Sequence, residues 1–290
     1  MSGSVRQNAS VFDFFSIGVG PSSSHTVGPM KAAYQFVLSL GNGAGISRLQ
    51  VTLHGSLAHT GLGHLTHQAI LMGLEGHQPH LIDPNTIHDR TLTILQNNKI
   101  SMPSGRQIAF NFNEDLIFDK EKKFSYHSNA MQFFAFDKNG NCVCHKVYYS
   151  VGGGFIEGEG VVSRNHHAHD EESIPYPFKT AQELLSLCEQ NKLTIAELML
   201  ENEKCFRSFD EIEDKLNEVL DVMLESIDEG CQATALIPGS LKLNRRAPSL
   251  YQSVLSSGEP KKGHPHPMNC LNCFAMAASE QNASGGRIVT

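Results

Sequence analysis

A run of hydroxyl and imidazole side chains over Ser22–Thr26 stands between two Gly-Pro pairs, directly before a helical pattern. Apolar residues then recur at helix spacing as far as Gly41, which predicts a helix over about 27–40. Hydroxyl groups at a helix start cap its free amides, and the same amides with the helix dipole favour a bound anion. Since one capping residue is enough, two interpretations stay open: a cap with surplus hydroxyls, or a site for a small carboxylate or phosphate.

The sequence from residue 10 to residue 157 mixes strand and helix patterns. Alternating or β-rich runs predict strands over residues 46–54, 107–112, 131–137 and 143–151. Helices are predicted from about 61 to 76 and over 84–97, with Asp83 as a cap and Pro84 in the first turn. The Asn139-Gly140 pair between the last two strands indicates a hairpin. These patterns predict an α+β domain over residues 10–157, a mixed α/β layout with a largely antiparallel sheet.

Three consecutive glycines, Gly152, Gly153 and Gly154, follow the last strand. They either let the chain leave the sheet through an unusual backbone angle or let a ligand approach the backbone closely. The polar residues 158–178 are then predicted to be a linker. The histidines over His166–His169 could bind a metal ion, but a solvated connector is the favoured interpretation of such a short tract.

Residues 179–290 carry helical patterns throughout and predict an all-α domain. The sequence Ser208-Phe209-Asp210-Glu211 is typical of a capping box, and apolar residues follow it at helix spacing as far as Gly230, which is predicted to end that helix. Further helices are predicted over 247–255 and 269–282. The chain ends shortly after a Gly-Gly pair, so this second domain is expected to be incomplete.

Composition narrows the classes of function. The net charge is −7 and no basic stripe is present, which argues against nucleic acid as a partner. No apolar run reaches the ~20 residues of a membrane span, and no signal-peptide core is found at the N-terminus, so a cytoplasmic protein without a membrane partner is expected. Seven cysteines without an export signal indicate reduced thiols.

The stretch His54–His64 holds three histidines between a strand and a helix. Their spacing fits no zinc motif, and a surface loop is the alternative. The glycines on either side of Leu62 favour a site at His64. His127-Ser128-Asn129 precedes a strand and is either a turn cap or part of a site. Cys270 and Cys273 form a lone C-x-x-C within an apolar helical pattern, which favours two buried thiols over a redox motif.

The sequence as a whole resembles the bacterial iron–sulfur-dependent L-serine dehydratases (L-serine ammonia-lyases) of the single-chain type. The resemblance is carried by segments spread along nearly the entire chain: Ser10–Met30, Gly55–His64, His127–Met131, Tyr149–Ile156, Ile237–Tyr251 and Glu280–Thr290.

This resemblance implies an N-terminal α+β domain similar to an allosteric substrate-binding domain, followed by an all-α catalytic domain with a [4Fe–4S] cluster. It implies deamination of L-serine to pyruvate and ammonia by β-elimination of water, without pyridoxal phosphate, in amino-acid catabolism and gluconeogenesis. It further implies a homodimer. Elimination needs a base for the α-proton and an electrophile for the departing hydroxide, and in the family a cluster iron is the electrophile.

Carried over by position, the resemblance implies His64 as the base, with His127 and His25 as further active-site histidines. The residues expected to bind substrate are Ser22, Ser23, Ser24, Thr26, Asn129 and Arg287. Gly152, Gly153 and Gly154 are expected to allow close backbone approach.

In the family the cluster cysteines lie beyond the position of Thr290, and non-cysteine residues stand where Cys270 and Cys273 are. No metal ligands are therefore assigned in this chain, which is expected to be inactive alone and to end inside a family motif. Two alternatives remain: a non-catalytic serine-binding regulatory module and a histidine-rich metal carrier.

Overall fold

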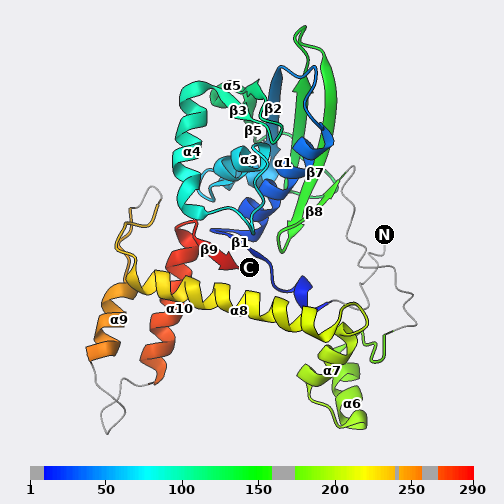
Figure 1. Ribbon diagram of the computed structural model, residues 1–290, viewed down its shortest axis with the longest axis vertical. Helices are drawn as coiled ribbons and strands as arrows, with labels where there is room; N and C mark the ends of the chain where they lie inside the picture. Colours follow the sequence, from blue (N-terminus) through cyan, green and yellow to red (C-terminus); the bar gives the residue numbers. More distant parts are fainter. Residues whose placement is uncertain (1–9, 159–173, 239–241, 257–266) are drawn as a thin grey trace. The chain divides into compact units, whose positions relative to one another are not determined.

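The computed structural model describes residues 10–158, 174–238, 242–256 and 267–290 (Figure 1). The histidines over His166–His169 and much of the expected linker lie outside these residues. By its internal contacts the chain divides into two compact units. One comprises Ile17–Val161 and Val222–Thr290, and the other Met1–Ser16 and Val162–Asp221.

The larger unit is built on a seven-stranded sheet with the order β3-β4-β2-β6-β7-β8, in which β5 pairs beside β2. The strands are β2 (Arg48–His54), β3 (Lys99–Ser101), β4 (Gln107–Ala109), β5 (Leu116–Asp119), β6 (Ala130–Phe136), β7 (Cys142–Gly152) and β8 (Phe155–Gly158). Only the pairings of β2 with β4 and β5 are parallel; the other ladders are antiparallel. The expected hairpin between β6 and β7 is confirmed.

Helices cover one face of this sheet. They are α1 (Gly28–Ser39), α2 (Gly55–Thr60), α3 (Thr66–Leu74) and α4 (Pro84–Asn97). Alternate residues of β2 (Leu49, Val51 and Leu53) are fully buried in the shared core, as the period of two requires. The ring centroids of Phe36 on α1 and Phe133 on β6 lie 5.2 Å apart. The predicted α+β class is thus confirmed, and so is α4 with its cap, because Asp83 accepts from the amide of Asn85.

Two local predictions for this unit were too simple. The strand expected over residues 107–112 ends at Ala109, because Asn111 caps a short helix, α5 (Phe112–Asp115). No helix is predicted directly after β2, where a surface loop is one alternative, but Gly55–Thr60 forms α2. At its start Gly55 has a φ of +55°, and a Cβ there would lie 2.1 Å from the carbonyl oxygen of Ser128. Only glycine fits both conditions.

The C-terminal part of the larger unit is formed by α9 (Ala247–Ser256), α10 (Pro267–Ala283) and β9 (Arg287–Val289). Strand β9 pairs antiparallel with β1 (Ile17–Val19). The prediction that Gly230 ends its helix is wrong, since α8 (Phe209–Gln232) continues past it. A Cβ on Gly230 would lie 2.3 Å from the carbonyl oxygen of Ala277 on α10, so this glycine allows close helix packing instead.

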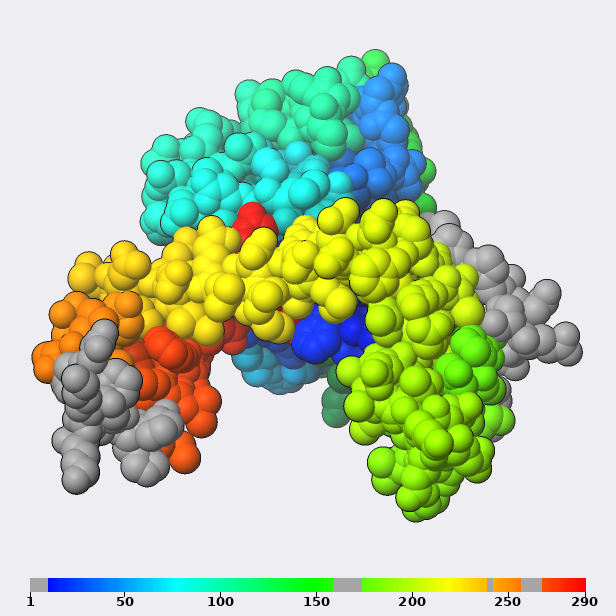
Figure 2. All heavy atoms as spheres, turned by 60° about the horizontal axis from the view of Figure 1, so that its bottom comes forward, coloured from blue at the N-terminus to red at the C-terminus, as the bar shows by residue number. Residues whose placement is uncertain are grey.

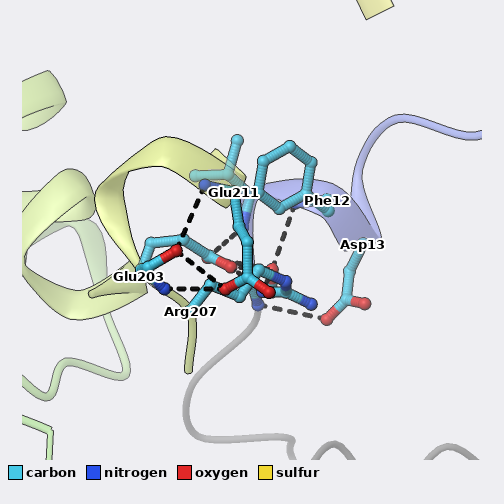
Figure 3. A network of polar contacts seen from close by, with 8 residues as sticks. Phe12, Asp13, Glu203, Arg207 and Glu211 are labelled. Carbon is cyan, nitrogen blue, oxygen red and sulfur yellow. Dashed lines mark hydrogen bonds and ion pairs between the residues drawn. The ribbon is translucent and has the colours of Figure 1, made fainter. Parts of the chain in front are cut away.

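The smaller unit joins the N-terminal segment to α6 (Ala181–Asn191) and α7 (Ile195–Glu203). Ser10 caps the short helix η1 (Val11–Asp13), and its hydroxyl donates to the buried Glu203 carboxylate at 2.9 Å. Arg207 forms an ion pair with the same carboxylate, and its guanidinium lies over the ring of Phe12 (Figure 3). This network holds the N-terminal segment against the end of α7. The sequence did not predict this contact, because its partners are distant in the chain.

Helix α8 begins with the predicted capping box, in which the hydroxyl of Ser208 accepts from the amide of Glu211 and donates to its carboxylate. Its atoms are coloured yellow in Figure 2. Along this helix acidic side chains and leucines such as Leu220 and Leu224 are both exposed. Within the part of the chain that the structure describes, no helix is long and apolar enough to cross a membrane.

Candidate functional site

The serine-rich stretch forms a π-helical turn, η2 (Ser23–Val27), that leads directly into α1. Ser22 caps this turn: its hydroxyl accepts from the amide of His25 at 3.1 Å, and its carbonyl accepts from the amides of Thr26 and Val27. One residue therefore does the capping, as a simple cap requires. The hydroxyls of Ser23 and Ser24 are not used for it. The Ser23 hydroxyl has no hydrogen-bond partner among the described residues, whereas the Ser24 hydroxyl contacts the ring of His25, so the second interpretation, a binding site, stays open.

The turn brings His25 against His64, which lies between α2 and α3. Their ring centroids are 4.8 Å apart. The Nδ1 atom of His25 shares a hydrogen bond of 2.9 Å with the Ser24 hydroxyl, and its Nε2 atom shares one of 3.0 Å with the hydroxyl of Ser56. Burial lowers the pKa of His25, and the nearby His64 lowers it further. Near neutral pH His25 is therefore an uncharged ring with both nitrogens engaged.

The tautomer of His64 is set by its neighbour Thr60. The Nδ1 atom of His64 lies 3.0 Å from the carbonyl oxygen of Thr60, and because a carbonyl only accepts, the Nδ1 atom carries the proton. In the neutral ring the Nε2 atom then holds the lone pair. That atom has no hydrogen-bond partner among the described residues. His64 thus presents a basic nitrogen, which is the arrangement that a proton-accepting imidazole needs.

His127 is arranged in the opposite way. Its Nδ1 atom accepts from the backbone amide of Asn129 at 3.1 Å, so in the neutral ring the proton lies on Nε2. The expected turn-capping contact is present. In this state the Nε2 atom of His127 is a donor, suited to hold a substrate oxygen and unsuited to remove a proton.

Backbone and side-chain contacts join four segments around the histidine pair. The amide of Ser56 donates to the carbonyl of Ser128, and the amide of Ser150 on β7 donates to the carbonyl of Asn129. The Ser150 hydroxyl donates back to the carbonyl of Ser24 at 2.7 Å. The start of α2, the segment before β6, β7 and the serine turn therefore form a closed ring of contacts.

Asn129 contributes an unused acceptor to this ring. Its Nδ2 amide donates to the carbonyl of Ser150, but its Oδ1 atom is buried and has no partner among the described residues. Buried polar atoms are nearly always paired in native proteins. This oxygen is therefore a candidate acceptor for a ligand donor.

The other predicted residues lie in different settings. Gly152, Gly153 and Gly154 all have positive φ and turn the chain from β7 into β8, so the backbone alone explains them; close approach of a ligand stays a prediction. Arg287 on β9 donates to the carbonyls of His80 and Ile82, at 2.6 Å each. Its guanidinium thus holds a loop of the same unit, and its expected contact with substrate also stays a prediction.

Sequence reasoning missed several residues that support the histidines, namely Ser56, Thr60, Thr66 and Ser150. All of them lie inside or beside the stretches quoted for the resemblance. Hydroxyl side chains close in sequence to a candidate base are a signal that could have identified these residues. Their partners, however, are distant in sequence and follow only from the fold.

A cavity of about 180 Å³ lies beside the serine turn. Apolar side chains form most of its wall, including those of Val19, Met30, Leu65 and Ile87, and neither His25 nor His64 lines it. Thr26 and Leu65, which follow the two histidines in the sequence, do line it. Its largely apolar wall does not suit a zwitterionic amino acid.

The cysteines do not form a metal centre in the part of the chain that the structure describes, where no group of three or more His, Cys, Asp and Glu side chains is placed to hold a metal ion. Cys273 is buried as expected, but Cys270, which was expected to be buried too, is only partly buried. Burial, together with the neighbouring Cys273 thiol, raises the pKa of Cys231 to about 11. The Cys231 thiol is therefore a poor nucleophile near neutral pH.

Two family models match the chain, the serine dehydratase beta chain over residues 10–161 and the serine dehydratase alpha chain over residues 190–290. The chain belongs to the serine dehydratase family. The L-serine dehydratase of Streptomyces coelicolor is 43% identical to it over 284 residues, L-serine dehydratase 1 of Escherichia coli 38% over 289 residues, and the L-serine dehydratase of Haemophilus influenzae 37% over 288 residues. Each match covers 97% of this chain and 62% of the relative, so the chain spans about three fifths of the length of these serine dehydratases.

Proposed function

We propose that this chain carries the substrate-binding and proton-abstracting part of an iron–sulfur-dependent L-serine dehydratase, which converts L-serine to pyruvate and ammonia. The observation that carries the proposal is the free basic Nε2 atom of His64, held in that tautomer by the carbonyl of Thr60. The serine dehydratase relatives support L-serine as the substrate by their names.

The proposed first step is removal of the α-proton of L-serine by the Nε2 atom of His64. The Cα–H bond is a very weak acid, so the base must be placed and oriented before reaction. Because the Thr60 carbonyl accepts from Nδ1, it also stabilises the imidazolium that forms. The neutral His25 beside it adds no charge repulsion, which a second protonated ring would.

The substrate is proposed to be held by the ring of segments around the histidines. The carboxylate would accept from the hydroxyls of Ser23 and Ser24, and the ammonium would donate to the buried Oδ1 atom of Asn129. His127, with its proton on Nε2, would donate to a substrate oxygen. Ser22 and Thr26 are proposed to add to substrate binding from the same turn. Arg287 is proposed as a further substrate-binding residue.

The described residues do not fit a [4Fe–4S] cluster. Such a cluster is held by three or four cysteine thiolates placed around it, whereas no group of three suitable side chains is found within the described ranges. We therefore derive no step through the cluster. We propose that its ligands are not supplied by these residues and that the 290-residue chain does not complete the elimination by itself.

Further proposals rest on the resemblance. They are a cytoplasmic homodimer without pyridoxal phosphate, and a division into an α+β domain over 10–157, a linker over 158–178 and an all-α domain over 179–290. The separate matches of the two family models support this division.

The test compares the 290-residue chain with the protein at the full length that its gene encodes. Both are incubated anaerobically with iron, sulfide and reductant, and pyruvate formation from L-serine is measured beside binding of L-serine by calorimetry. Pyruvate formed by the full-length protein, with loss on exposure to air, is the expected result. Binding of L-serine without any pyruvate would instead establish the serine-binding regulatory module, and full turnover by iron-free protein would exclude the cluster.

A further inference from the structure

Two threonine hydroxyls tie the segments of His25 and His64 together in a crossed pattern. The Oγ1 atom of Thr26, the residue after His25, donates to the carbonyl of His64 at 2.8 Å. The Oγ1 atom of Thr66, two residues after His64, donates to the carbonyl of His25 at 2.5 Å. Each histidine backbone is therefore held by the segment of the other.

Both threonines are almost completely buried, with exposed fractions of 3% for Thr26 and 0% for Thr66. Leaving a buried hydrogen-bonding group such as these hydroxyls without a partner costs about 1–3 kcal/mol. Any shift of one histidine segment against the other would break both bonds at once. The crossed pair therefore resists that particular movement.

Ordinary threonine chemistry does not explain these bonds. Threonine hydroxyls in helices often donate to the carbonyl four residues earlier, as Thr91 does to Ile87 at 2.8 Å in α4. Such bonds are local and stabilise one helix turn. Thr26 and Thr66 reach partners 38 and 41 residues away instead, so their bonds define how two separate segments meet.

The backbone conformation between His64 and Thr66 also indicates that this segment is held in place. Leu65 has a φ of +55°, a left-handed conformation that L-residues other than glycine rarely adopt. Such strain costs about 1–2 kcal/mol and persists only where the surroundings hold the backbone in place. Here the fixed carbonyl of His64 on one side and the buried hydroxyl of Thr66 on the other hold it.

We propose that Thr26 and Thr66 are positioning residues, which hold the imidazoles of His25 and His64 at their close separation. The consequence for catalysis rests on the proposed function, but the positioning itself does not. The two claims can therefore be tested apart.

The first measurement is an NMR titration of His25 in the 290-residue chain, with its signals assigned by His25→Asn. The variants Thr26→Val and Thr66→Val keep the side-chain shape and remove the hydroxyl. They should loosen the pair, so that water reaches His25 and repulsion from His64 weakens, and the pKa of His25 should rise towards its ordinary value. Thr26→Ser and Thr66→Ser restore the hydroxyl and should titrate like the wild type.

Thr91→Val is the matched control, since Thr91 is a comparably buried threonine whose hydroxyl donates to a carbonyl away from the histidines. It should lower the melting temperature by a similar amount and leave the titration of His25 unchanged. If the valine variants of Thr26 and Thr66 fold and titrate like Thr91→Val, the inference is wrong. If one valine variant does not fold, the titration of the other valine variant, compared with its serine counterpart, still tests the positioning role.

The second measurement is kinetic and uses the full-length enzyme. A misplacement of about 1 Å can cost 100-fold in rate, so the valine variants should lower kcat by 10- to 100-fold with little change in KM. A shifted titration together with an unchanged kcat would leave the positioning intact and overturn the catalytic role of the histidine pair. An unchanged titration overturns the positioning whatever the kinetics show.

Discussion

The imidazole rings of His25 and His64 lie with their centroids 4.8 Å apart, although one precedes α1 and the other follows α2. They are not equivalent. Both nitrogens of His25 are hydrogen-bonded to serine hydroxyls, whereas the Nε2 atom of His64 is left with a lone pair. Under the proposed function, this difference gives the two rings separate tasks, with His64 as the proton acceptor and His25 as an uncharged neighbour.

Replacing His64 tests that separation most directly. His64→Asn keeps an amide that can donate to the Thr60 carbonyl but removes the base. A positioned general base typically contributes ~10²–10⁴-fold, so kcat of the full-length enzyme should fall by that order with folding preserved. Exchange of the α-deuteron of L-serine with solvent should disappear as well.

His127→Asn is the comparison, because the tautomer of His127 makes it a donor. It should raise KM more than it lowers kcat. If His127→Asn abolishes turnover while His64→Asn leaves kcat near the wild-type value, the base is His127.

Substitutions of the adjacent residues Ser22 and Ser23 distinguish helix capping from recognition of L-serine. Ser22→Ala removes the acceptor for the His25 amide and should cost about 1 kcal/mol of unfolding free energy, as loss of an N-cap does. Ser23→Ala should leave stability unchanged, since its hydroxyl has no hydrogen-bond partner among the described residues, but should weaken L-serine binding. Thermal unfolding and calorimetry measure the two effects. Equal losses of stability with unchanged affinity would show that the serine run is only a cap.

In the smaller unit, Arg207 neutralises the buried carboxylate of Glu203. Arg207→Ala would leave that charge buried and unpaired, so we expect a loss of about 3–5 kcal/mol in urea unfolding. Lys204→Ala breaks the neighbouring exposed pair with Glu201 and should cost under about 1 kcal/mol. Similar effects of the two substitutions would show that the Glu203 network contributes little. Replacing Glu203 and Arg207 together by Met should recover part of the loss.

Stability should fall on acidification, because burial lowers the pKa of His67 and contributes in the same way at His25, His54 and His77. In the unfolded chain these imidazoles titrate near 6.5. Below that pH the unfolded state binds more protons than the folded state, so the unfolding free energy decreases from about pH 7 down to the folded-state pKa values.

His67→Phe should reduce this dependence, since it removes the titrating imidazole and keeps an aromatic ring beside Phe112, to which the His67 ring lies edge-on. Urea unfolding between pH 7 and pH 5 measures the slope, with the exposed His59→Gln as control. A slope that is unchanged in His67→Phe but reduced in His59→Gln would contradict the assignment.

The sequence by itself determined the elements whose causes are local. Asp83 and Pro84 specified the start of α4, Asn139-Gly140 the hairpin, and Ser208 with Glu211 the start of α8, because capping and turn bonds join residues only a few positions apart. The α+β class followed from the same periodicities, and the family resemblance selected His25, His64 and His127 as candidates.

Only the tertiary structure decided how these candidates are arranged. The tautomer of His64, the crossed bonds of Thr26 and Thr66, and the packing role of Gly230 depend on partners that the fold brings together from distant positions. A hydrogen bond assigns a proton only through its geometry, and no spacing in the sequence contains that geometry.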